Sequence, residues 1–145
     1  MSITDNICCE FFVVRYHGQN IYLLEVQMER NLALFPQDAN GDMLWQMLLE
    51  GDDLSEIREV EFSVLFPNQE LALKFGHLLL ENNQKLSFCP FQGDPEYPWE
   101  ITAYPEMGAS YENIMAYQHL LETSSAPLQG KFDGWYCVTA GKLPY

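Results

Sequence analysis

The spacing of apolar residues changes several times along the chain, and the order of these changes limits the folds that the chain can adopt. From Ile57 to Leu65 apolar and polar residues alternate, which is typical of a strand with one buried face. From Leu71 to Leu79 the apolar residues recur at helical spacing, which predicts an amphipathic helix that ends near Asn82. A strand followed at once by a helix indicates a fold in which helices pack against a sheet.

Further segments complete the series. In chain order they are a helix from Asp38 or Asn40 to Gly51, strands at Gln84–Cys89 and Pro98–Ala103, a helix that begins after Ser110, a loop at Ser124–Gly130 and a strand at Phe132–Thr139. From residue 57 onward the order is strand, helix, strand, strand, helix, strand, which is the ferredoxin-like arrangement. The sequence therefore predicts an α+β fold, with a ferredoxin-like antiparallel sheet that carries its helices on one face.

Two apolar runs near the N-terminus, Cys9–Tyr16 and Ile21–Met28, flank a polar tetrapeptide at residues 17–20. This pattern predicts a β-hairpin, in which Gly18 allows a positive φ in the turn. The first run is apolar at nearly every residue, so we expect its strand to be buried on both faces. The hairpin and a helix thus precede the predicted sheet.

The chain is strongly acidic, and its length suits one domain. We predict a single domain over residues 1–145, with the hairpin as an extension at 1–35 and the core at 36–140. Seven Lys and Arg against 21 Asp and Glu give a net charge of −14 at pH 7. This charge repels nucleic-acid phosphates and acidic lipids, so direct binding to nucleic acid or membranes is not expected. It attracts basic protein segments, which makes a cationic protein the natural partner.

Neither the cysteines nor the N-terminal residues indicate a cofactor or an exported protein. Cys8 and Cys9 are adjacent, whereas Cys89 and Cys137 are far apart, so neither a zinc-binding spacing nor a disulfide framework is evident. The first residues lack the pattern of a signal peptide, and no apolar run approaches the roughly 18 residues that a membrane span needs. We therefore expect a cytoplasmic protein without a cofactor.

Carboxylates form the one pattern that suggests a site. Glu59 and Glu61 lie on the polar face of one predicted strand, and Glu100 joins them if the neighbouring strand pairs as we expect. Such a group can bind a divalent metal, perform acid–base chemistry or form an acidic docking surface for Lys and Arg. On an open sheet face without a pocket, the acidic surface is the interpretation that we prefer.

No nucleophilic site is evident in the sequence. The histidines His17, His77 and His119 fall in separate predicted elements, and none belongs to a recognisable motif with a Ser or Cys. No catalytic residue is therefore predicted, and we do not expect an enzyme.

The segment Phe132–Trp135 is the most distinctive in the chain. Asp133 and Gly134 inside a predicted strand suggest a β-bulge, in which the glycine relaxes the backbone and the aspartate accepts hydrogen bonds from amides. Trp135 then either anchors the end of the sheet or offers an aromatic contact to a partner. Asp133 and Trp135 therefore join the three glutamates as candidate partner-binding residues.

This ending also carries a resemblance to a known family. The aromatic-Asp-Gly-Trp motif at Phe132–Trp135, together with the helix end Leu48–Asp52, the strand Arg58–Phe62 and the helix Leu71–Leu80, resembles the type B regulators of ribonuclease E, small acidic bacterial proteins. The resemblance spans about residues 41–138. It implies a ferredoxin-like fold and a protein that binds the basic C-terminal part of the endoribonuclease and alters RNA turnover without cutting RNA.

The leading hypothesis follows from the charge and the resemblance together. An acidic face that contains Glu59 and Glu61, with Trp135 nearby, docks a basic segment of an RNA-processing endoribonuclease and inhibits it sterically. Two alternatives stay open. In one, the hairpin and Trp45 build a homodimer or an interaction module with a different partner; in the other, the carboxylates bind a metal.

Overall fold

The structure is a computed structural model that describes the backbone of residues 7–14 and 22–138 and the side chains of residues 29–138. The strands are β1 (Ile7–Val14), β2 (Tyr22–Glu29), β3 (Ile57–Phe66), β4 (Leu86–Pro90), β5 (Trp99–Ala103), β6 (Glu106–Gly108) and β7 (Lys131–Cys137). The helices are α1 (Ala39–Leu49), α2 (Gln69–Glu81) and α3 (Tyr111–Ser125), and a 3₁₀ turn at Ala126–Leu128 follows α3.

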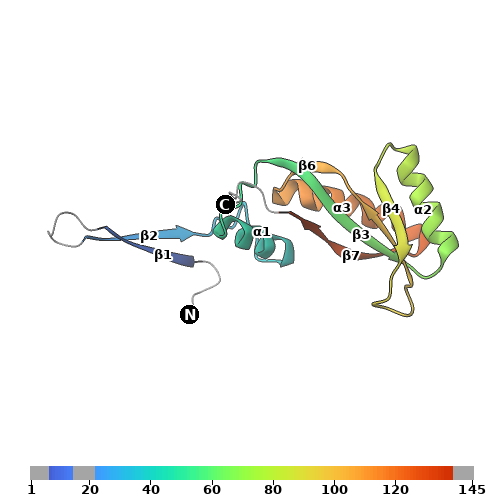
Figure 1. Cartoon of the computed structure of the whole chain (residues 1–145), viewed down its shortest axis with the longest axis horizontal. Helices are drawn as coiled ribbons and strands as arrows, with labels where there is room; N and C mark the ends of the chain where they lie inside the picture. The colour runs from blue at the N-terminus through green and yellow to red at the C-terminus, as the bar shows by residue number, and fades with distance from the viewer. Residues whose placement is uncertain (1–6, 15–21, 139–145) are drawn as a thin grey trace.

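Strand β3 is the centre of the larger sheet (Figure 1). Along one edge it pairs with β5 and then with β6, and along the other edge it pairs with β7. Strand β4 pairs with the outer edge of β5. Helix α2 connects β3 to β4, and α3 connects β6 to β7. The chain therefore crosses the sheet twice through a helix, and every strand pair in the sheet is antiparallel.

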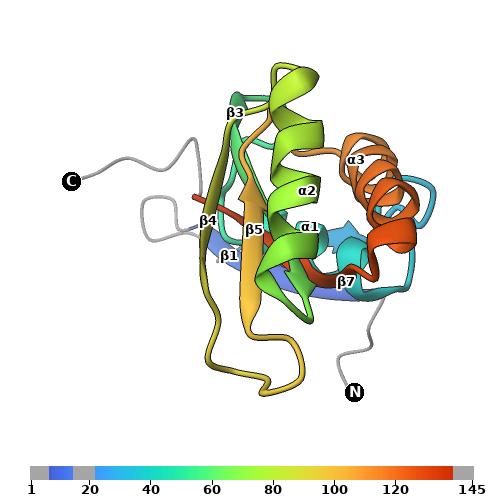
Figure 2. The ribbon, with the colours of Figure 1, turned by 90° about the vertical axis from the view of Figure 1, so that its right-hand side faces the viewer.

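Helices α2 and α3 pack on the same face of this sheet. The ring of Phe62 lies 4.8 Å from the ring of Tyr117 on α3, and the ring of Phe66 lies 5.3 Å from that of Phe75 on α2, measured between centroids. Phe62 and Phe66 are an even number of residues apart on β3, so both point to one face. Figure 2 shows both helices on one side of the strands. The core lies between them and the strands.

Helix α1 begins where the sequence predicts, and a close approach fixes its first turn. The carboxylate of Asp38 caps the helix by accepting a hydrogen bond from the N–H of Gly41 over 2.8 Å. A Cβ atom on Gly41 would lie 1.8 Å from the carbonyl oxygen of Pro36, so a larger residue does not fit. Further along, Trp45 is buried with its ring 5.4 Å from that of Phe35 and belongs to the core.

The predicted N-terminal hairpin is present. Strands β1 and β2 pair antiparallel, from Ile7 opposite Glu29 to Val14 opposite Tyr22. The hairpin extends away from the rest of the molecule (Figure 1). The predicted turn at residues 17–20 and the predicted burial of the first strand's side chains lie outside what the structure describes.

The α+β class and the antiparallel sheet are confirmed, with one unpredicted strand. Pro105 interrupts the pattern after β5, because proline has no N–H to donate to a ladder. The chain nevertheless resumes pairing with β3 as β6, and the carbonyl of Pro105 accepts a hydrogen bond from Val60 N–H over 2.9 Å. Because β6 departs from the six predicted elements, the ferredoxin-like assignment stays a prediction.

Several predicted boundaries also differ, most of them by one residue. Strand β4 begins at Leu86 and not at Gln84, because the chain between α2 and β4 first turns through Asn83 with a positive φ of 60°. Helix α3 continues to Ser125, whereas the sequence predicts a loop from Ser124. The hydroxyls of Thr123 and Ser124 donate to carbonyls of the preceding helical turn and do not form a competing local turn. The last strand ends at Cys137, whereas Thr139 lies outside the described residues.

Candidate protein-binding face

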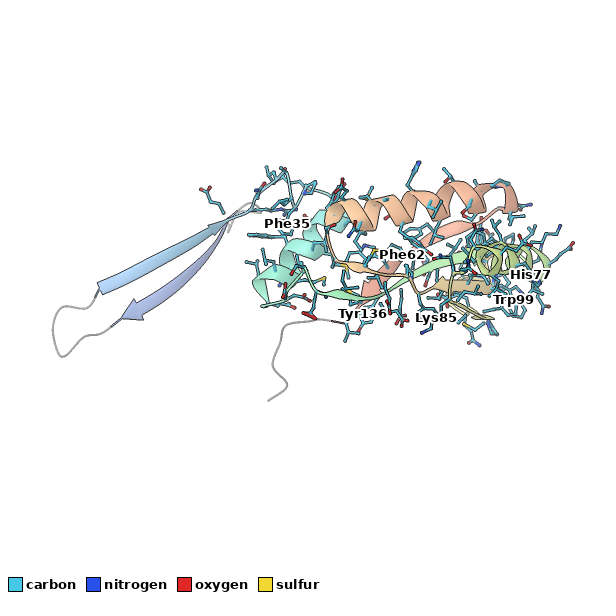
Figure 3. All side chains as sticks on the ribbon, turned by 90° about the horizontal axis from the view of Figure 1, so that it is seen from above. Phe35, Phe62, His77, Lys85, Trp99 and Tyr136 are labelled. Atoms are coloured by element: carbon cyan, nitrogen blue, oxygen red, sulfur yellow. The ribbon has the colours of Figure 1, made fainter. Side chains whose placement is uncertain are left out.

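One face of the sheet is not covered by any helix of the described residues (Figure 2), and we call it the open face. Along β3 the side chains of Val60, Phe62 and Val64 point into the core, so those of Glu59 and Glu61 point to the opposite face. Cross-strand pairing adds side chains from the other strands to this face. They are Glu100 and Thr102 of β5, Glu106 of β6 and Tyr136 of β7. Figure 3 shows Lys85 and Tyr136 on this side of the sheet, away from α3.

Glu59 is held by a lysine of the same chain. The Nζ atom of Lys85 lies 2.7 Å from Oε2 of Glu59 and 5.4 Å from the centre of the Tyr104 ring. Glu106 stands directly opposite Glu59 in the ladder. The hydrogen bond to Glu59, with further attraction from Tyr104 and Glu106, raises the pKa of Lys85 above its ordinary value. Two like charges therefore face each other across β3 and β6, and Lys85 offsets their repulsion.

A second lysine repeats this arrangement at the other end of the face. Lys131, at the start of β7, lies 3.3 Å from Oδ2 of Asp94 and 5.1 Å from the centre of the Tyr97 ring. The pKa of Asp94 is lowered, first by the hydrogen bond that it accepts from the N–H of Glu96 and then by Lys131. Lys85 and Lys131 are thus each held between a carboxylate and a tyrosine ring.

Glu61 and Tyr136 form a third carboxylate–tyrosine pair, without a lysine. They stand directly opposite each other where β3 pairs with β7. The side chain of Tyr136 is 56% exposed, and that of Glu61 is partly exposed. Among the residues described, neither side chain takes part in an ion pair or a hydrogen bond. The pair therefore offers a negative charge beside an aromatic ring on the protein surface.

Glu100 lies on the predicted face but not beside the other two glutamates. The register of β3 and β5 sets it opposite Leu65, four residues from Glu61 along β3, a separation of about 13 Å at roughly 3.3 Å per residue. Its carboxylate oxygen Oε1 accepts a long hydrogen bond from the thiol of Cys89, with 3.7 Å between the sulfur and the oxygen. Burial, and after it the charge of Glu100, raises the pKa of that thiol. Glu106, which the sequence analysis missed, takes the place expected of Glu100.

The last strand contains the predicted bulge, and it turns Trp135 inward. The register of β3 and β7 shifts between Ser63 and Val64, and Gly134 has a φ of +120° that favours glycine. Asp133 is exposed at this bulge. Trp135 is only 9% exposed and lies on the helix-covered face, so the structure does not bring it beside Glu59 and Glu61. The expectation that Trp135 lies near those glutamates on one surface is therefore wrong.

The described part of the chain offers little else that suggests chemistry. His77 and His119 are exposed on α2 and α3, and His17 lies outside the described residues. Within residues 7–14 and 22–138, no group of three or more His, Cys, Asp or Glu side chains is arranged to hold a metal ion. In the same part of the chain, no helix has the length and apolar character needed to cross a lipid bilayer.

Comparison with known protein families gives a match over most of the chain. The family described as regulator of ribonuclease activity B matches residues 37–137, which span α1 to β7 and include every residue of the open face named above. No curated protein and no solved structure matches the chain. The matched region covers more than half of the 145 residues and leaves out the hairpin. The chain therefore belongs to the family of regulators of ribonuclease activity B.

Proposed function

We propose that this protein inhibits an endoribonuclease of the ribonuclease E type by binding a basic segment of that enzyme on the open face. Membership of the family supports the regulatory role. The excess of 21 Asp and Glu over seven Lys and Arg supports a basic partner, because opposite charge attracts it from a distance. In this account the protein acts as a binding regulator and performs no chemistry of its own.

The observation that carries the proposal is the pair formed by Glu61 and Tyr136. Twice on the open face a lysine lies with its Nζ against a carboxylate and about 5 Å from a tyrosine ring. Glu61 and Tyr136 offer the same two groups to a cation from outside. An arginine suits the pair best, because its planar guanidinium can bind the carboxylate and stack on the ring at once.

Binding at this face inhibits RNA cleavage without reaching the catalytic site of the enzyme. Basic segments of RNA-processing proteins hold RNA through its phosphates. Carboxylates of the open face compete with those phosphates for the same Lys and Arg side chains. Because the charges are exposed and salt screens them over about 8 Å at physiological ionic strength, the complex should weaken as salt rises.

The other predicted partner-binding residues take different parts in this proposal. Glu100 and Asp133 extend the negative charge beyond the Glu61–Tyr136 pair, and contribute to the attraction of the partner more than to its contacts. Trp135 makes no contact with the partner and holds β7 in place from the core side.

A calorimetric titration tests the proposal. The chain is titrated with the C-terminal half of ribonuclease E from the same organism, at low and at physiological salt, and cleavage of a model RNA is measured in parallel. We expect saturable binding that weakens with salt and slows cleavage. An absence of heat at either salt would reject this enzyme as the partner, and binding that leaves cleavage unchanged would reject inhibition.

A further inference from the structure

A second surface, on the helix side of the molecule, forms an apolar groove of about 1030 Å³. We call it the α3 groove. It lies between the first half of α3 and two loops, one before α1 and one before β3. The side chains that line it include Leu34, Phe35, Leu54, Ala109, Met115 and Ala116. Leu34 is 59% exposed, and a partner that covers this leucine would be stabilised by removing its apolar surface from water.

The apolar surface continues beyond the groove toward β6. A shallower hollow of about 450 Å³ shares Ala116 with the α3 groove and is lined by Ile57 and Leu120. Both of these side chains are more than half exposed. A continuous apolar surface of this kind on a soluble protein marks a site of interaction.

The charges around the α3 groove have one sign. Glu112 lines the groove and Glu106 lines the adjoining hollow, whereas no Lys or Arg among the described residues lines either of them. The carboxylate of Asp38 accepts a hydrogen bond from the hydroxyl of Tyr111, a residue that lines the groove, so Asp38 adds a further negative charge next to it. A partner segment that fills the groove therefore gains from lysine or arginine on either side of its apolar residues.

The backbone around the groove favours a helix over a strand as the occupant. A bound strand needs unpaired backbone groups along an edge. The N–H groups of Leu34 and Phe35 already bond to Asn31, and that of Ala109 bonds to the carbonyl of Leu54. The groove thus offers side chains for contact, which suits the apolar face of an amphipathic helix.

We propose that the α3 groove binds a basic amphipathic helix of a partner protein, with apolar residues at helical spacing in the groove and Lys or Arg at its rim. This inference goes beyond the proposed function, because it concerns the opposite side of the molecule and a structured segment. The two surfaces meet along β6, where Glu106 both lines the hollow and stands opposite Glu59 of the open face. One partner can therefore occupy both.

The test uses a labelled model peptide of leucine and lysine, with the leucines at helical spacing, and fluorescence anisotropy with the full chain. Leu34→Ser removes an apolar contact from the groove. Leu80→Ser on α2 is the matched control, since Leu80 is 58% exposed and lies outside the groove. We expect Leu34→Ser to weaken binding about tenfold, which corresponds to about 1.4 kcal/mol, and Leu80→Ser to leave it unchanged.

A second variant, Ala116→Trp, fills the groove from an exposed position of α3 and should weaken the peptide to a similar degree. Equal affinity for both leucine variants would overturn the proposal. So would equal affinity for a peptide of the same composition with scrambled leucines, because charge alone would then explain binding. A light-scattering mass of two chains that falls to one in Leu34→Ser would assign the groove to a second copy.

Binding at the open face and binding at the α3 groove can be tested independently of each other. An unstructured polylysine peptide should respond to charge reversal of Glu59 and Glu61 and not to Leu34→Ser. The amphipathic peptide should respond to Leu34→Ser whether or not ribonuclease E is the partner.

Discussion

The indole N–H of Trp135 donates a hydrogen bond to the side-chain oxygen of Asn40 over 2.7 Å. The amide nitrogen of Asn40 in turn donates to Oε1 of Gln118 over 2.8 Å. Asn40 lies in the first turn of α1, Trp135 on β7 and Gln118 on α3. One amide side chain therefore ties together three elements that are far apart in the sequence, and the tryptophan of the distinctive Asp-Gly-Trp motif is a structural residue.

Trp135→Phe should destabilise the fold, because it leaves the oxygen of Asn40 without its donor in a partly buried place. We expect a loss of about 1–3 kcal/mol in the free energy of unfolding, measured by urea denaturation. Tyr136→Phe, on the exposed side of the same strand, is the control and should change stability by less than about 0.5 kcal/mol. A Trp135→Phe protein with native stability and lost partner binding would contradict this assignment.

Arg58→Met should be more damaging than any surface charge change. The guanidinium of Arg58 lies 2.7 and 3.0 Å from the two carboxylate oxygens of Asp52, whose side chain is fully buried. The variant removes the guanidinium from beside that buried carboxylate, and breaking a buried ion pair costs about 3–5 kcal/mol. Lys74→Met removes the exposed pair with Glu70 and should cost at most about 1 kcal/mol. Equal unfolding midpoints of the two variants would show that the buried ion pair of Asp52 stabilises the fold no more than the exposed pair of Lys74.

Gly134→Ala tests the bulge in β7. Gly134 has a φ of +120°, a conformation that L-residues adopt only with strain of about 1–3 kcal/mol. Gly108→Ala is the matched control, because a Cβ atom there meets nothing closer than 3.6 Å and its φ is ordinary. We expect thermal unfolding to shift downward in the first variant and to change little in the second. A larger downward shift in Gly108→Ala than in Gly134→Ala would mean that the bulge accommodates a Cβ atom at residue 134 without backbone strain.

Asp38 and Tyr111 give the fold a defined dependence on pH. The hydrogen bond from the Tyr111 hydroxyl lowers the pKa of Asp38, and the same bond raises the pKa of Tyr111. A carboxyl group with a lowered folded pKa stabilises the fold above its unfolded pKa of about 3.9 and loses this effect as the pH falls through the folded value. A tyrosine with a raised folded pKa stabilises below its unfolded pKa of about 10 and loses the effect as the pH rises.

The interaction should therefore contribute in the window between about pH 4 and pH 10. Tyr111→Phe should raise the pKa of Asp38 toward its ordinary value, as followed by carboxyl chemical shifts in an NMR titration. An unchanged titration of Asp38 in this variant would show that the hydroxyl is not the main cause of its shift.

The elements of the fold were predictable where the pattern is local. The alternation of Val60, Phe62 and Val64 with Glu59 and Glu61 fixes both the strand and its buried face, because side chains of a strand alternate. The Asp38 cap is equally local. These predictions needed no knowledge of which strands pair.

The site was less predictable, because it depends on register. Whether Glu100 or Glu106 stands beside Glu59 is set by how β5 and β6 align on β3, and no local pattern encodes this alignment. The face that Trp135 occupies depends on the extra residue at the bulge, which changes the alternation along β7. The α3 groove joins residues from three distant segments, so nothing in their local sequences indicates it.

A calorimetric titration of two charge-reversed variants with the C-terminal half of ribonuclease E tests whether the open face is the binding site. One is Glu59→Lys with Glu61→Lys on the open face, and the other is Glu70→Lys with Glu81→Lys, two exposed residues of α2 that change the net charge equally. The open-face variant should lose binding by tenfold or more, about 1.4 kcal/mol, while the α2 variant should retain most of its affinity. Equal losses in both variants would show that only net charge matters, and would contradict a binding site on the open face.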